Sequence, residues 1–69
     1  MLSQKDLEKK GFELKGKDIN ILTESDLRIL LMYEMWSDGM DWKDVQNIET
    51  DTYWTKTLLT QYLQSCFGY

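Results

Sequence analysis

The stretch Leu27–Trp36, which reads Leu-Arg-Ile-Leu-Leu-Met-Tyr-Glu-Met-Trp, decides the fold. Only Arg28 and Glu34 are polar in this run. At about 100° per residue, the apolar side chains of such a helix surround its axis, so the helix needs packing partners on more than one side. The sequence therefore predicts a central core helix against which the other elements pack.

Helix start signals recur along the chain. Ser3, Thr23 and Asp41 are residue types that cap helix N-termini, and each is followed three residues later by an aspartate, which suits the positive end of a helix dipole. Gly11 is placed to adopt the left-handed conformation that ends a helix. Together with the apolar spacing, these signals predict four helices, at about 3–10, 24–37, 42–48 and 52–66.

Residues 12–22 change from a helical to an alternating pattern. A polar turn at 15–18 lies between two alternating apolar pairs, Phe12 with Leu14 and Ile19 with Ile21. This pattern predicts a small hairpin, or else a single strand or an extended connector. The predicted fold class is therefore mainly α, or α+β if the hairpin forms, in a single domain spanning 1–69.

The composition indicates a small protein without enzymatic activity. The chain has 69 residues, no histidine and one cysteine, Cys66. Without histidine it lacks the usual acid-base group near neutral pH, and Cys66 has no neighbouring base, so we expect no catalysis and a buried Cys66. A lone thiol favours the reducing cytoplasm. No apolar run approaches the roughly 20 residues of a membrane span, so no membrane segment is expected.

The charge is unevenly distributed. The net charge is −4, with five lysines against four carboxylates in residues 1–22 and three cations against eight carboxylates in residues 23–69. Five of these carboxylates form a predicted acidic edge: Asp38, Asp41, Asp44, Glu49 and Asp51. Their spacing does not fit a calcium loop, because Met40 and Trp42 stand at two ligand positions, and we expect no metal and no cofactor. An acidic edge predicts attraction for a basic partner protein and repulsion of DNA.

The last predicted helix has two different faces. One face is apolar and includes Trp54, whereas the other carries neutral polar and aromatic side chains: Tyr53, Thr57, Thr60, Gln61 and Gln64. Lys56 is the only charged residue in this segment. Such side chains can hydrogen-bond to a protein surface or to base edges in DNA. This neutral face is therefore a second candidate binding surface.

The order of elements over 23–66 resembles the helix-turn-helix superfamily: a long helix, a tight turn, a short helix, a second turn at 49–51 and a last helix. The segment Trp54–Leu63 is similar to the recognition helices of winged-helix repressors such as the penicillinase-repressor group. The resemblance implies a helix-turn-helix-like core. It also implies that four side chains face a DNA groove: Tyr53, Thr57, Thr60 and Gln61.

Glu34 falls inside the apolar arc of the central helix. A charge there is costly unless it reaches solvent, a lysine or an amide donor. Glu34 therefore either lies at the rim or marks a face that meets another chain. A short chain also has few elements with which to cover a helix that is apolar on all sides, so homodimerisation is a further expectation.

These features predict a small acidic regulator or inhibitor that binds a basic partner protein, for example a nucleic-acid-binding protein. Phages and other mobile elements often encode proteins of this kind. One alternative is a dimeric DNA-binding transcriptional regulator that reads DNA with the helix at 52–66. Another is a structural subunit of a larger assembly.

Overall fold

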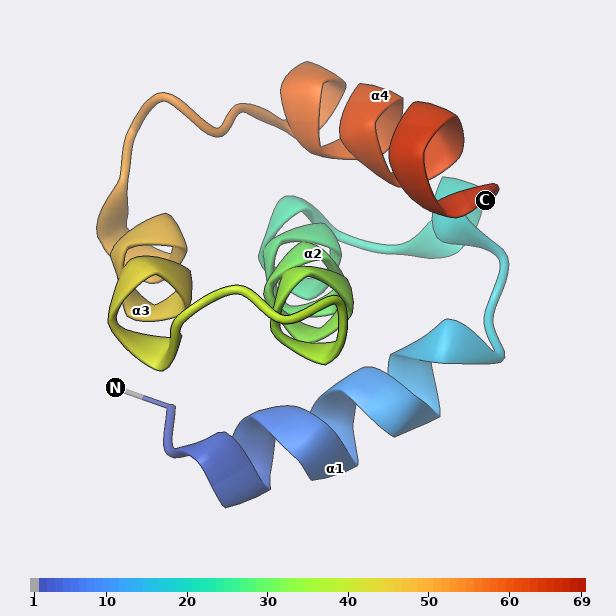
Figure 1. Cartoon of the computed structure of the whole chain (residues 1–69). Coiled ribbons are helices and arrows are strands. Elements are labelled where there is room, and N and C mark those ends of the chain that lie inside the picture. The colour runs from blue at the N-terminus through green and yellow to red at the C-terminus, as the bar shows by residue number, and fades with distance from the viewer. Residues whose placement is uncertain (1) are drawn as a thin grey trace.

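The computed structural model describes residues 2–69, which fold into helices around a common core (Figure 1). These helices are α1 (Gln4–Lys15), the short 3₁₀-helix η1 (Ile19–Ile21), α2 (Glu24–Ser37), α3 (Trp42–Thr50) and α4 (Lys56–Phe67). No strand occurs among the described residues, so the mainly α-helical fold class is confirmed. None of the helices in residues 2–69 combines the length and the apolar character needed to cross a membrane.

The helix α2 lies at the centre, and α1, α3 and α4 each pack against it. Figure 1 shows α1 below α2, α4 above it and α3 beside it. Four side chains of α2 and four from the other helices are fully buried together: Leu27, Leu30, Leu31, Met32, Leu7, Val45, Leu59 and Leu63. Each such burial contributes about 1.5–3 kcal/mol. The core helix is thus covered within one chain, and a homodimer is not needed to cover it.

The start of α2 follows from its capping residues. The Thr23 hydroxyl accepts a hydrogen bond from the Asp26 N–H at 3.1 Å, and the Asp26 carboxylate accepts one from the Thr23 N–H at 3.5 Å. This reciprocal pair satisfies two backbone donors that the helix itself leaves free. The observed bounds of α2 agree with the predicted helix at 24–37.

The first helix is longer than predicted. The predicted end at Gly11 is wrong, since α1 continues to Lys15 and Gly11 is a buried residue in its interior. The reason is a close approach of two helices: a Cβ added to Gly11 would lie 2.2 Å from Cγ of Tyr33. Gly11 is therefore required because it has no side chain at the contact between α1 and α2, and its conformation is helical.

The hairpin predicted within 12–22 is also wrong. Residues up to Lys15 belong to α1, and Asp18 caps η1 by accepting a hydrogen bond from the Asn20 N–H at 3.0 Å. Leu14 and Ile19 are buried, whereas Phe12 and Ile21 are 73% and 72% exposed. The four apolar side chains are therefore divided between the core and solvent, and they do not share one face.

The last helix begins later than predicted. The predicted bounds 52–66 are wrong at the start, because Thr55 is the N-cap and its hydroxyl accepts a hydrogen bond from the Leu58 N–H at 3.4 Å. In addition, α3 extends to Thr50, so the predicted turn at 49–51 is replaced by a connection at 51–55. Both α3 and α4 pack on α2. This arrangement alone does not confirm a helix-turn-helix core, which stays a prediction.

Candidate partner-binding surface

Arg28 of α2 holds the connection between α3 and α4 in place. Its Nη1 donates hydrogen bonds to the carbonyl oxygens of Ile48 at 2.7 Å and Asp51 at 3.0 Å, and its Nη2 donates one to Trp54 at 2.6 Å. These carbonyls lie at the negative end of α3 and just beyond it, where a cation is favoured. The sequence-based prediction missed this role. The available signal was the single arginine in an otherwise apolar core helix, because its guanidinium group needs hydrogen-bond acceptors.

The connection at 51–55 carries an exposed tyrosine, Tyr53, whose backbone and ring both make contacts within the chain. The Asp51 carboxylate accepts a hydrogen bond from the Tyr53 N–H at 3.0 Å. The rings of Tyr53 and Trp54 meet edge to face at 5.3 Å, and Trp54 meets Tyr62 of α4 in the same way at 4.9 Å. Tyr53 nevertheless remains 57% exposed. Because its surroundings are fixed, Tyr53 can be enclosed by a partner at a small cost in conformational entropy.

The outer face of α4 follows this connection in the chain. Thr57, Gln61 and Gln64 are exposed and recur at the spacing of one helix face. Thr60 is half-buried, and its hydroxyl donates a hydrogen bond to the Lys56 carbonyl at 2.9 Å. Tyr53 lies before α4 and not on it. Tyr53 thus precedes the start of α4 by three residues in the chain, while the Thr60 hydroxyl already donates a hydrogen bond within the helix.

The predicted acidic edge separates into two groups at the two ends of α3. Asp38, Asp41 and Asp44 are exposed at the α2–α3 turn and in the first turn of α3. Asp41 occupies the N-cap position but makes no side-chain capping bond, contrary to its predicted role. In the described part of the chain, no three carboxylates or thiols are arranged to hold a metal ion.

The second acidic group, Glu49 and Asp51, lies at the other end of α3. Asp44 and Glu49, the members of the two groups that lie within α3, are separated by about 7 Å along the helix axis. Glu49 Oε1 accepts a hydrogen bond from the Leu2 N–H at 3.4 Å. Asp51 is joined directly to Tyr53 by the hydrogen bond described above. Of the five predicted acids, Asp51 is therefore the one that the structure ties to the tyrosine.

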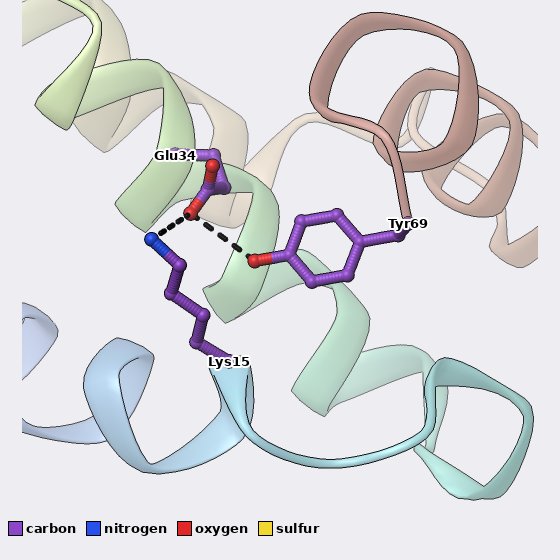
Figure 2. A network of polar contacts seen from close by, with 3 residues as sticks. All are labelled: Lys15, Glu34 and Tyr69. Carbon is purple, nitrogen blue, oxygen red and sulfur yellow. Dashed lines mark hydrogen bonds and ion pairs between the residues drawn. The ribbon is translucent and has the colours of Figure 1, made fainter.

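Glu34 has partners inside the chain (Figure 2). Its side chain is 13% exposed, its Oε1 accepts a hydrogen bond from the Tyr69 hydroxyl at 3.1 Å, and Lys15 Nζ lies 3.9 Å away. Burial, followed by the charge of Glu34 and this hydrogen bond, raises the pKa of Tyr69 from 10.0 to about 12. Glu34 thus ties the end of α1 and the last residue of the chain to α2.

Cys66 is exposed, so its predicted burial is wrong. It shares a face of α4 with Leu59 and Leu63, which are fully buried. Cys66 lies in the last turn of α4, where its side chain is exposed although the neighbouring Phe67 packs against the core.

Models of known protein families, curated proteins and solved structures were all compared with the chain, and none of them matches it.

Proposed function

We propose that the protein is a small regulator or inhibitor that binds a basic partner protein in the cytoplasm through the connection at 51–55 and the outer face of α4. The observation that carries this proposal is the exposed ring of Tyr53 on a connection whose Asp51 and Trp54 carbonyl oxygens accept hydrogen bonds from Arg28. Tyrosines held in this way are typical centres of protein interfaces, because little entropy is lost when a partner encloses them.

The charges around Tyr53 favour a basic partner. Asp51 contacts the tyrosine backbone, Glu49 lies at the same end of α3, and residues 23–69 carry eight carboxylates against three cations. Such a field accelerates encounter with a cationic surface and slows encounter with an anionic one. The group at Asp38, Asp41 and Asp44 adds to this field from the other end of α3.

The alternative is a DNA-binding regulator that reads its site with α4, as the helix-turn-helix resemblance implies. Phosphate contacts supply most of the affinity of such proteins. Lys56 is the only cation in α4, and the guanidinium of Arg28 is already bonded to three carbonyl oxygens. These observations favour a protein partner over DNA. The remaining alternative, a structural subunit of an assembly, shares the prediction of a protein partner.

Two measurements test the proposal. Affinity capture from the native host should retain a basic protein with the wild-type chain and lose it with Tyr53→Ala. The matched control is Ile21→Ala, which truncates an exposed apolar side chain on η1 and should leave capture unchanged. Titration with a random DNA duplex at low and moderate salt should show no binding. Binding with a steep dependence on salt would instead support the DNA-binding alternative.

A further inference from the structure

Four aromatic side chains from three helices form a row, called here the aromatic strip: Phe12, Tyr33, Trp36 and Trp42. Phe12 of α1 is 73% exposed and lines an open groove of about 740 Å³ together with Tyr33 of α2. Trp36 follows Tyr33 by three residues, so the two are neighbours on one face of α2. The ring of Trp36 meets that of Trp42, at the start of α3, edge to face at 5.9 Å. Each ring of the strip thus adjoins the next.

The rings of the aromatic strip are held by the fold without being enclosed by it. Tyr33, Trp36 and Trp42 are half-buried and pack against the core from outside. Gly11 lets the Tyr33 ring lie directly against the backbone of α1, and the edge-to-face contact orients the two tryptophans. Aromatic side chains that are already positioned lose little conformational entropy when a partner covers them. The aromatic strip therefore has the properties of a contact surface.

The charges at both ends of the aromatic strip are mainly negative. The groove of Phe12 is lined by three carboxylates against two lysines: Asp6, Glu8, Glu13, Lys5 and Lys9. The turn that joins Trp36 to Trp42 and the first turn of α3 carry three exposed carboxylates against one lysine: Asp38, Asp41, Asp44 and Lys43. The ion pair recorded in residues 2–69 joins Lys15 to Glu34 and involves none of these six carboxylates. They are therefore available to cations of a partner.

We propose that the aromatic strip binds an amphipathic helix of a partner protein, in which lysine or arginine flanks the apolar face. The 5.9 Å between the Trp36 and Trp42 rings is close to the pitch of an α-helix, about 5.4 Å, so apolar residues one turn apart can each contact one ring. The flanking cations then reach the carboxylates at the two ends of the strip. Cations near the tryptophan faces gain a further attraction to the rings.

The charges of the strip make other occupants less favourable. A second copy of the chain brings the same carboxylates and a net charge of −4, and nucleic acids and anionic membranes are also negative. Trp42 begins α3 whereas Tyr53 follows its end, and Figure 1 shows α1 and α4 on opposite sides of α2. The aromatic strip is thus a surface separate from that around Tyr53. The inference goes beyond the proposed function and does not depend on it.

A designed peptide tests the proposal before the partner is known. The probe is a helix of about 14 residues made only of leucine and lysine, with leucine on one face, and it is titrated against the isotope-labelled chain. The indole N–H signals of Trp36 and Trp42 should shift and saturate. The indole signal of Trp54, which contacts Tyr53, should not move. A peptide of the same composition in scrambled order has no apolar face and should bind at least tenfold more weakly.

Truncation of Phe12 tests the contribution of the strip itself. Phe12→Ala should weaken binding of the leucine-lysine peptide at least fivefold. The substitution is at an exposed position, so the core is not altered. Ile21→Ala is the matched control, because it truncates an apolar side chain of nearly equal exposure on η1, and it should stay within twofold of the wild type. Equal effects of the two truncations would overturn the proposal.

Removal of two carboxylates tests the charge of the partner. Asp38→Asn combined with Asp41→Asn should weaken the peptide at least fivefold. Asp18→Asn combined with Glu24→Gln makes the same change in net charge at exposed positions before η1 and at the start of α2, and should stay within twofold. A peptide with glutamate in place of lysine should bind at least tenfold more weakly than the lysine peptide, and equal binding of the two would contradict a basic partner.

Three further results would overturn the proposal. The first is the absence of saturable shifts at Trp36 and Trp42 up to millimolar peptide. Shifts confined to Trp54 would place the peptide at the surface around Tyr53 instead, which overturns this inference and leaves the proposed function standing. The second is a dimer of the free chain in sedimentation equilibrium that Phe12→Ala dissociates, because a second copy then covers the strip. The third is flotation of the chain with phosphatidylcholine vesicles that Phe12→Ala abolishes, because a membrane then covers it.

Discussion

Nη2 of Arg28 lies 2.6 Å from the carbonyl oxygen of Trp54, 26 residues further along the chain. The same guanidinium also reaches the carbonyls of Ile48 and Asp51. One side chain of the central helix therefore fixes where the chain leaves α3 and how it approaches α4. This bond pattern gives Tyr53 a defined position between the two helices.

Removal of the Arg28 donors should destabilise the fold. Arg28→Met keeps an apolar stem but leaves three carbonyls without their partner, so we expect the free energy of unfolding to fall by about 2 kcal/mol. Arg28→Lys keeps the charge without the planar fork and should cost about 1 kcal/mol. Urea denaturation measures both. Lys43→Met, at an exposed position of α3, is the control and should cost less than about 0.5 kcal/mol.

The fold could be predicted where the signals are local. The Thr23 and Asp26 pair is encoded by neighbouring residues, and the bounds of α2 followed from it. The role of Gly11 was predicted wrongly, because the sequence alone does not distinguish a glycine that ends a helix from a glycine that lets a second helix approach closely. The contact with Tyr33, which is distant in the sequence, decides between the two. The identity of an element is thus readable from its own residues, whereas its end can depend on a distant partner.

The candidate site was predicted in part for the same reason. Thr57, Gln61 and Gln64 lie on one exposed face of α4, as their spacing indicates. The start of α4 was predicted at 52, whereas Thr55 is the N-cap in the structure. Arg28 bonds the Trp54 carbonyl across 26 residues, just before the cap that the structure uses. No local pattern contains that contact.

Two glycine substitutions should have different effects on stability. In Gly11→Ala the new Cβ would lie 2.2 Å from Cγ of Tyr33, so the helices must separate, and we expect a loss of about 1–3 kcal/mol although alanine favours helices. Gly16→Ala is the matched control, because nothing lies within 4 Å of its added Cβ and its φ is −85°. Thermal unfolding should show no loss for Gly16→Ala. Equal losses for the two variants would contradict the close approach.

Tyr69 should make stability depend on alkaline pH. Its pKa is about 12 in the folded chain and 10.0 in the unfolded reference, so the folded chain binds this proton more tightly. The resulting stabilisation is fully present below pH 10 and is lost as the pH rises through about 12. Tyrosinate absorbance of the wild type minus that of Tyr69→Phe isolates this residue. A difference curve with its midpoint near pH 10 would contradict the burial of Tyr69 and its contact with Glu34.

Cys66 should react in the folded state. Because the side chain is exposed, a thiol reagent should modify it in native conditions at a rate similar to that in urea. Cys66→Ser should change the free energy of unfolding by less than about 0.5 kcal/mol. If the thiol reacted only after the chain had unfolded, Cys66 would be buried, which would contradict its exposed position in the structure.

Site-specific photocrosslinking from position 53 tests the proposed function most directly. A photoreactive phenylalanine analogue replaces Tyr53 in one variant and the exposed Ile21 in the control, and both are irradiated in the native host and analysed by mass spectrometry. We predict one basic protein crosslinked from position 53 and absent from position 21. Crosslinks to DNA, or the same products from both positions, would contradict a protein-binding surface around Tyr53.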